Sequence, residues 1–529
     1  MKNLKKIFSK LYFPFTPVLF SFSFVLAQFF AWFNEVYINS IWIPLGIAVV
    51  LSLFVFGLLF LVFRNRTKAE MFSTIFLILF FSYSAIFSLK WDIVITVGKY
   101  NFGKNQFEYF VFILLLAFLF IRLLRSKSKF MRWGTWIRKL SILLFTVSLV
   151  MVLWKQFQRM TLPIPGSQLI LPKINASGVD KSKLPDIYFI EPEDDAAPRV
   201  FRKYLNYDES DFMNYLNNDG FYVVRGATSN YPKTFLSLAS MLNMEYLDYL
   251  SKYKNSSDFT VVNPLIEDNN VMRFLKQYGY KYYQMGSWWG PTQYNPAADD
   301  NFTIEDEGRL SIDSFLYNLA DSTALSPYLG KVVPVSAIGD SDDDDRARLV
   351  YQFNKLPQIV DIPGPKFVFA HIIAPHGPYV FGKNCEYVDE STTSKNPESE
   401  NYVNQTICIN QKLESAISTI ISRSKKPPVI IVLTDEGIPY LNTNLNPADD
   451  WKNAPDSVIQ EKFPILAALY LPGVSTESLN PNMTPVNIFR SVLDLYFNAG
   501  LPQLPDKNYI FMDLNNLYQF KDVTSVVNH

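Results

Sequence analysis

Acidic residues are scarce in the first third of this 529-residue chain. Residues 1–157 contain four Asp or Glu against 18 Lys or Arg, whereas the rest of the chain holds 45 acidic and 31 basic residues. The formal net charge of zero therefore hides a basic, apolar part of +14 and an acidic part of −14. Such an asymmetry is typical of a membrane anchor that carries a water-facing domain. It indicates lipids and envelope molecules as partners and excludes nucleic acid.

The basic part contains five apolar runs, near residues 11–33, 41–63, 71–89, 107–124 and 139–157. Each has about 18–23 residues, and a helix needs about 20 residues to cross the hydrocarbon core of a bilayer. The runs are too long and continuous for barrel strands, and no small-residue cleavage pattern follows the first. We therefore expect a retained anchor of five transmembrane helices over residues 1–157. It lacks the paired halves and intramembrane charges typical of a transporter.

Lysine and arginine in the connecting segments predict the orientation of the anchor. The segment before the first run holds four, the second loop three, the fourth loop seven and the first loop none. Basic residues collect on the cytoplasmic side of a membrane. The segment before the first run, the second loop and the fourth loop are therefore expected in the cytoplasm. The third loop, with three basic residues, fits this pattern least well. Five crossings would place residue 158 and everything after it outside the cytoplasm.

Cysteine is almost absent: the chain has only Cys385 and Cys408, separated by 22 residues in the predicted exported part. In an oxidising compartment such a pair is expected to form a disulfide, which would stabilise the fold by roughly 3 kcal/mol. The alternative is two unpaired thiols.

The exported part begins with a segment rich in Pro, Gly and Ser, residues 158–183, which predicts a linker lying along the membrane surface. Residues 184–529 are enough for one large domain with a sizeable core. Short β-branched runs alternate there with segments whose apolar residues recur at three- and four-residue steps. This alternation predicts an α/β domain with a mainly parallel central sheet covered on both faces. In such sheets ligands bind where the strands end.

Four places near predicted strand ends or helix starts carry residues that could do chemistry, namely Glu193, Thr234, the pair His371 and His376, and the pair Asp435 and Glu436. Taken singly each has a structural explanation, such as a turn or a helix cap. Together they make a coherent site, because a divalent metal held by carboxylates lowers the pKa of a threonine hydroxyl and stabilises phosphoryl charge. A nearby histidine can move a proton or contact an oxyanion. Since His371 lies inside the strand, we expect His376 to have that role.

With these residues in place, the exported part resembles the alkaline phosphatase/sulfatase superfamily, and most closely its membrane-bound lipoteichoic acid synthases and lipid A phosphoethanolamine transferases. The resemblance rests on the order of six segments along the chain: LPDIYFIEPE (184–193), NYPKTFLSLASMLNMEYL (230–247), GSWWGPTQYNPAAD (286–299), AHIIAPHGPYVF (370–381), LTDEG (433–437) and LPGVS with TPVNIFRSVLDLYF (471–497). It covers most of residues 184–515. It implies an anchor of five helices followed by a sulfatase-like extracytoplasmic sandwich.

The resemblance also assigns roles to residues. Glu193 corresponds to a metal ligand, Thr234 to the nucleophile that becomes covalently modified, and Asp435 to a second carboxylate ligand. His376 corresponds to a histidine that contacts the transferred group. Trp288 and Trp289 fall in a segment that would line the substrate, although paired aromatic residues are more often part of a core.

One departure from the family pattern concerns the metal. The family has Asp-His-Gly where this chain has Asp435-Glu436-Gly437, so that the expected ligands Glu193, Thr234, Asp435 and Glu436 are all oxygen donors. Oxygen ligands favour Mg²⁺ or Mn²⁺ over Zn²⁺. The additional carboxylate, Glu436, would also repel an incoming phosphate. The alternative to a change of metal is therefore a site that has lost its catalytic activity.

These observations give a hypothesis with two rivals. The leading one is a metal-dependent enzyme of the bacterial inner membrane that transfers a phosphoryl-alcohol headgroup from a phospholipid, through a phospho-threonine, to an envelope glycan or lipid acceptor. Since the chain has no C/S-x-P-x-R motif, which sulfatases modify to formylglycine, phosphoryl rather than sulfuryl transfer is expected. With water as acceptor the enzyme would be a phosphodiesterase or phosphatase. The rival from another class is an inactive relative that binds an envelope glycan or a protein.

Overall fold

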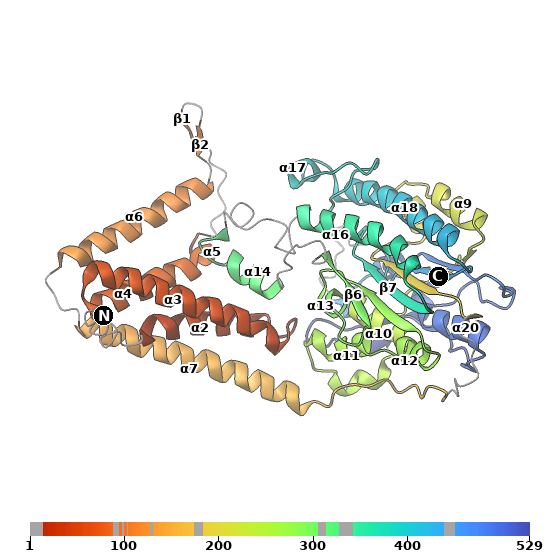
Figure 1. The fold of residues 1–529 in the computed structure, drawn as a ribbon, viewed down its shortest axis with the longest axis horizontal. Coiled ribbons are helices and arrows are strands. Elements are labelled where there is room, and N and C mark those ends of the chain that lie inside the picture. Colours follow the sequence, from red (N-terminus) through yellow and green to blue (C-terminus); the bar gives the residue numbers. More distant parts are fainter. Residues whose placement is uncertain are drawn as a thin grey trace. The chain divides into compact units, whose positions relative to one another are not determined.

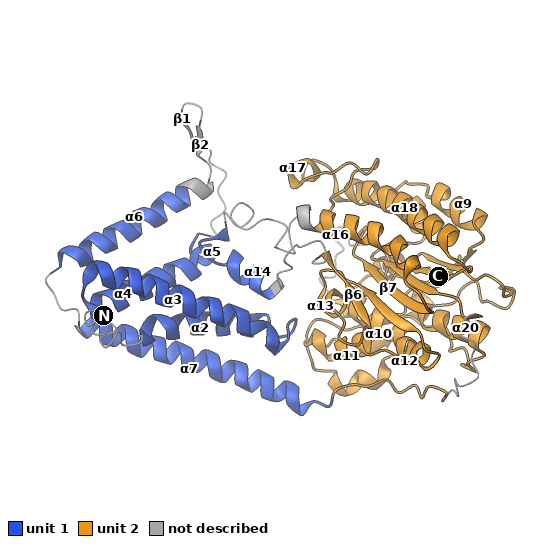
Figure 2. Cartoon of the chain, in the orientation of Figure 1, with its two compact units in different colours: residues 1–163, 312–338 blue, residues 164–311, 339–529 orange. Residues whose placement is uncertain are grey.

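The computed structural model describes residues 14–87, 95–97, 100–102, 104–126, 131–173, 183–304, 314–326, 342–438 and 450–528. The chain divides into two compact units, which Figure 2 shows in different colours. The first unit comprises residues 1–163 with 312–338, and the second comprises residues 164–311 with 339–529. Residues 312–338 thus group with the first unit, although the sequence analysis assigned them to the exported domain.

The first unit is helical. Its helices are α2 (Phe15–Ala31), the short 3-10 helix η1 (Ile38–Ile41), α3 (Trp42–Phe63), α4 (Arg66–Phe81), α5 (Tyr83–Ile86), α6 (Lys104–Arg125), α7 (Met131–Thr161) and α14 (Ser314–Asp321), with a hairpin of β1 (Ile95–Val97) and β2 (Tyr100–Phe102). Each predicted apolar run coincides largely with a helix, and α7 continues past the predicted end at residue 157. Within this unit α14 packs on α2, where the rings of Phe315 and Phe29 meet edge to face at 5.6 Å.

Among the residues that the structure describes, three helices are long and apolar enough to cross a membrane, over Ile38–Phe63, Phe107–Arg125 and Arg132–Thr161. The other two expected spans are shorter, because α2 has 17 residues and α4 has 16. In addition, α4 starts with the charged residues Arg66, Lys68 and Glu70, which shortens its apolar part. The prediction of transmembrane helices is therefore supported for three segments, and the number five stays a prediction.

The second unit is built on a seven-stranded sheet with the order β4-β9-β8-β3-β7-β5-β6. The strands are β3 (Ile187–Pro192), β4 (Tyr222–Val223), β5 (Lys281–Met285), β6 (Asp300–Phe302), β7 (Lys366–Ile372), β8 (Val429–Leu433) and β9 (Ala467–Tyr470). The five strands from β8 to β6 are parallel, whereas β9 and β4 are antiparallel to their neighbours. The sheet is thus mixed and mostly parallel, as the alternation of strands and helices predicted.

Helices cover both faces of this sheet (Figure 1). One layer includes α10 (Thr234–Asn243), α11 (Asn263–Glu267), α12 (Asn270–Gln277) and α20 (Pro485–Phe497), and the other includes α9 (Ser210–Asn218), α16 (Asp342–Lys355) and α18 (Glu398–Arg423). The central strand β3 is wholly buried, and its side chains point alternately toward the two helix layers. Ile187 and Phe189 belong to one core, whereas Tyr188 and Ile190 belong to the other. A two-sided core of this kind explains why the strand reads as a continuous apolar run.

Smaller elements complete the second unit. They are α8 (Pro198–Tyr204), α13 (Gly290–Gln293), α17 (Glu390–Thr393), α19 (Asp456–Lys462) and α21 (Thr524–Val527), the 3-10 helices η4 (Asp248–Tyr253), η5 (Phe259–Val262), η9 (Leu356–Asp361) and η10 (Trp451–Asn453), and a hairpin of β10 (Tyr509–Phe511) and β11 (Phe520–Asp522).

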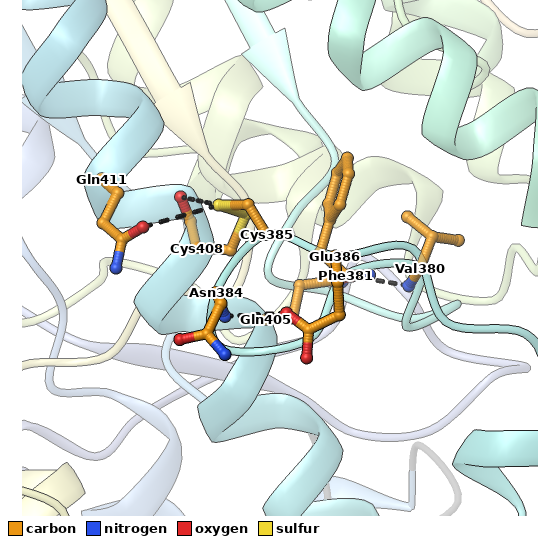
Figure 3. The surroundings of a disulfide bond; sticks show 8 residues. All are labelled: Val380, Phe381, Asn384, Cys385, Glu386, Gln405, Cys408 and Gln411. Atoms are coloured by element: carbon orange, nitrogen blue, oxygen red, sulfur yellow. Dashed lines mark hydrogen bonds between the residues drawn. A yellow bond between two sulfur atoms is a disulfide. The ribbon is translucent and has the colours of Figure 1, made fainter.

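The predicted disulfide is confirmed. Cys385, in the loop after β7, is bonded to Cys408 on α18, with their Cα atoms 5.0 Å apart (Figure 3). One helical turn before Cys408, the Gln405 side chain accepts hydrogen bonds from the backbone N–H groups of Val380 and Phe381 at 2.7 and 3.2 Å. The disulfide and Gln405 thus attach the same loop to α18.

Candidate active site

The candidate residues meet where the parallel strands end. Glu193 directly follows β3, His371 lies near the end of β7, and Asp435 follows β8 after one intervening residue. Because β7 and β8 both pair in parallel with β3, these three ends lie at one edge of the sheet. This is the edge at which α/β sheets bind ligands.

Thr234 is the first residue of α10, and its hydroxyl donates a hydrogen bond to Glu193 Oε1 at 2.9 Å. No side-chain hydrogen bond caps this helix, so the threonine does not have the structural role of an N-cap. The N-terminus of a helix carries a partial positive charge and free N–H groups, which favour an anion. The arrangement therefore offers a hydroxyl, its hydrogen-bond acceptor and an anion-favouring helix end at the same point.

Three carboxylates lie together beside Thr234. Glu193, Asp435 and Glu436 each offer an oxygen atom within 4.8 Å of the others, and all three side chains are buried. Within the described part of the chain, both Asp435 oxygens and Glu436 Oε2 are buried without a hydrogen-bond partner. Buried carboxylate oxygens are costly unless a cation or a proton neutralises them. The donor set thus fits a divalent metal ion, and its oxygen chemistry suits Mg²⁺ or Mn²⁺.

A buried lysine, which the sequence analysis did not identify, lies next to these carboxylates. Lys462 Nζ is 2.9 Å from Asp194 Oδ1 and 3.4 Å from Glu436 Oε1. It also donates to the carbonyl oxygens of Gly437 and Ile438 at 3.0 and 3.1 Å. Nothing in the local pattern EKFP around Lys462 indicates this role, because the contact depends on the packing of α19 against the loop after β8.

His371 was assigned a structural role from the sequence, but its ring lies in the candidate site. His371 Nε2 is 3.1 Å from Glu191 Oε2 and 3.4 Å from Glu193 Oε2, and Nδ1 is 2.7 Å from Thr292 Oγ1. The side chain is fully buried, so it orients Glu193 from the side away from solvent. Its position inside a strand concealed this, because the last residues of a parallel strand already belong to the ligand-binding edge.

His376 lies at the more open side of the site. Its Nε2 is 3.9 Å from Asp194 Oδ2, its side chain is 38% exposed, and its backbone N–H donates to the Glu193 carbonyl at 3.3 Å. Burial lowers the pKa of His376, but the negative charges of Glu193 and Asp194 outweigh this and raise it above its usual value. A protonated imidazole in this position can contact a phosphoryl oxygen or donate a proton.

The carboxylates differ in protonation. Burial favours the neutral form of Glu193, but the charge of His376 and the hydrogen bonds of His371 and Thr234 outweigh it and bring the pKa to about 2. Burial, together with the charges of Glu193 and Asp194, raises the pKa of Asp435 to about 6. Burial also raises the pKa of Glu436 well above its usual range, although Lys462 opposes this. The set therefore favours a cation, which would replace the protons on the last two groups.

The two tryptophans have different positions. Trp289 packs edge to face on the His371 ring, with ring centroids 5.9 Å apart. It is also partly buried against the core on the α10 side of the sheet, and its role in lining the substrate stays a prediction. Trp288 is partly buried and contributes no ring contact among the described residues.

Comparison with known proteins yields structures of low sequence identity. The C-terminal periplasmic domain of EptC from Escherichia coli is 13% identical over 67% of this chain and 97% of that chain, with a TM-score of 0.42. Lipooligosaccharide phosphoethanolamine transferase A from Neisseria meningitidis is 13% identical over 92% and 96%, with a TM-score of 0.38. The lipoteichoic acid synthase LtaP from Listeria monocytogenes is 13% identical over 66% and 82%, with a TM-score of 0.38. No curated protein sequence matches the chain.

The comparison that decides the family is one of sequence. The profile of the family described as Sulfatase matches residues 204–497, more than half of the chain, and this range contains Thr234, His376, Asp435 and Glu436. The chain belongs to the sulfatase family, as its resemblance to this superfamily implied.

Proposed function

We propose that this protein transfers a phosphoryl-alcohol headgroup from a membrane phospholipid to an envelope glycan or lipid acceptor. The observation that carries the proposal is the Thr234 hydroxyl, hydrogen-bonded to Glu193 at the N-terminus of α10 beside a buried set of carboxylates. The apolar helices of the first unit support a protein of the bacterial inner membrane. An anchor would hold the site near lipid headgroups and raise the effective donor concentration. The extracytoplasmic location of the second unit is part of the proposal.

In the proposed reaction the Thr234 oxygen attacks the headgroup phosphorus. A bond forms between this oxygen and phosphorus, the bond from phosphorus to the lipid glycerol oxygen breaks, and diacylglycerol leaves with a proton. The Thr234 hydroxyl proton is held by Glu193, and His376 can supply a proton to the leaving oxygen. In the second step an acceptor hydroxyl attacks phosphorus and passes its proton to His376, the bond from phosphorus to Thr234 breaks, and the threonine oxygen takes its proton back from Glu193.

A divalent metal ion at Glu193, Thr234, Asp435 and Glu436 would lower the pKa of the threonine hydroxyl and stabilise charge on the phosphoryl group. Three carboxylate oxygens without a hydrogen-bond partner, both of Asp435 and Oε2 of Glu436, support such an ion, and Mn²⁺ or Mg²⁺ suits them better than Zn²⁺. They also weigh against the rival in which this relative binds a glycan or a protein without catalysis, since without a metal ion their burial is uncompensated.

Intact-mass spectrometry with metal analysis tests the proposal, using purified full-length protein beside Thr234→Ala. The protein is incubated with membrane phospholipid and, in separate samples, Mg²⁺, Mn²⁺ or Zn²⁺. We expect a bound divalent ion and a phosphoryl adduct that is absent from Thr234→Ala, and the adduct mass identifies the transferred group. An adduct that disappears with water alone indicates a phosphodiesterase. Neither metal nor adduct under any condition would reject the proposal in favour of the binding protein.

A further inference from the structure

The position of Lys462 is fixed by its backbone as well as by its ammonium group. Lys462 is the last residue of α19, and its carbonyl accepts a hydrogen bond from Gly437 N at 2.8 Å. A Cβ atom at residue 437 would lie 2.3 Å from this carbonyl oxygen, so only glycine allows the two segments to approach so closely. The loop that carries Asp435 and Glu436 is therefore in direct backbone contact with the end of α19.

The ammonium group is enclosed by oxygen atoms. Its neighbours are Asp194 Oδ1, Glu436 Oε1 and two backbone carbonyl oxygens, at 2.9–3.4 Å, and the residue is 3% exposed. A buried charge is stable only when it is paired and hydrogen-bonded, and these contacts satisfy the lysine. Only one oxygen of Glu436 takes part, since Glu436 Oε2 is buried without a hydrogen-bond partner.

We propose that Lys462 is a positioning residue that acts through Glu436, and this inference rests on the proposed function. The ammonium group holds Glu436 by Oε1 and leaves Oε2 without a hydrogen-bond partner among the described residues. It also cancels one negative charge of the site. It thereby compensates for the repulsion that four neighbouring carboxylates, Glu193, Asp194, Asp435 and Glu436, would exert on an anionic phosphoryl group. Lys462 makes a strongly acidic metal site compatible with a phosphate substrate.

This role has a signature that a purely structural role lacks. Removal of the positive charge makes the site more negative, so a divalent cation should bind more tightly while phosphate binds more weakly. A lysine that only supports the fold would weaken both when it is removed. Lys462→Arg keeps the positive charge, so both affinities should stay near the wild-type values.

The experiment uses full-length protein in detergent and isothermal titration calorimetry. Mn²⁺ is titrated into metal-free protein, and inorganic phosphate into Mn²⁺-loaded protein. For Lys462→Met we expect Mn²⁺ to bind several-fold more tightly and phosphate to bind about tenfold more weakly, on the scale of one charge at an effective dielectric constant of about 20. For Lys462→Arg, which keeps the positive charge and every carboxylate of the site, we expect both values near wild type. The matched control is Lys452→Met, which removes a half-exposed lysine paired with Asp513.

The outcomes separate this inference from the proposed function. If wild-type protein binds neither Mn²⁺ nor phosphate, the proposed function fails. If wild-type protein binds both, and Lys462→Met weakens both or Lys462→Arg shows the same changes as Lys462→Met, the role of Lys462 is rejected. Should Lys462→Met fail to fold by circular dichroism, Lys462→Gln decides: tighter Mn²⁺ binding with weaker phosphate binding supports the inference, and joint weakening rejects it.

Discussion

The buried carboxylates predict that a bound metal ion stabilises the protein. They also predict that a rising pH lowers the stability of the metal-free protein but increases the stabilisation by metal. A ligand at about 100 times its Kd adds about 2.7 kcal/mol to the free energy of unfolding. For a domain of several hundred residues each kcal/mol raises the unfolding temperature by about 2–4 °C, so saturating Mn²⁺ should raise it by about 5–10 °C. Thermal unfolding of the full-length protein, followed by tryptophan fluorescence, measures this shift.

The pH dependence follows from Asp435. Its pKa is raised to about 6 in the folded protein, against an ordinary value of 3.8, so the folded state holds the proton more tightly than the unfolded state. This contribution to stability is complete below about pH 4. It is lost as the pH rises from about 4 through about 6, by at most about 1.4 kcal/mol per pH unit. Metal binding needs the ionised carboxylates, so the stabilisation by Mn²⁺ should grow over the same range.

Two variants make this prediction refutable. Glu193→Gln removes a carboxylate of the set and should abolish the metal-dependent shift, whereas Glu477→Gln, at an exposed position, should retain it. The reasoning is refuted if neither Mg²⁺, Mn²⁺ nor Zn²⁺ raises the unfolding temperature at pH 7.5. It is equally refuted if Glu193→Gln responds to metal as the wild type does.

Three further variants test the surroundings of the site. Replacing Cys385 and Cys408 by alanine should lower the free energy of unfolding by about 3 kcal/mol, because the disulfide closes a loop of 23 residues. Denaturant unfolding against oxidised wild type measures this loss, and reduced wild type should resemble the variant. Gln405→Leu removes side-chain hydrogen bonds that hold the loop carrying His376, and should lower phosphoryl-adduct formation more than the unfolding temperature. Gly437→Ala should lower the free energy of unfolding by about 1–3 kcal/mol and weaken Mn²⁺ binding in calorimetry, because the added Cβ would collide with the Lys462 carbonyl oxygen. Unchanged values would contradict the close contact between these two segments.

Much of the organisation follows from local sequence. The alternation of β-branched runs with amphipathic segments predicted the mostly parallel sheet, because residues that pack on two faces of a buried strand are necessarily apolar in succession. Thr234, Glu193 and Asp435 could be selected as a group because Thr234 begins a helix and the two carboxylates lie within two residues of a strand end, where α/β sheets bind ligands. The spacing of Cys385 and Cys408 in an exported domain sufficed for the disulfide.

Local sequence was thus sufficient to predict the basic and acidic parts of the chain, its apolar helices, the class of its sheet and the residue types of the site. Which charges neutralise one another depends on tertiary packing. Lys462 reaches Glu436 and Asp194 because α19 packs against two strand-end loops, and its separation from Asp194 of more than 200 residues leaves no local signal. His371 likewise became a partner of Glu191 and Glu193 only through the parallel pairing of β3 with β7. Periodicity reports which face of an element is buried, whereas the partners across an interface depend on how the elements pack.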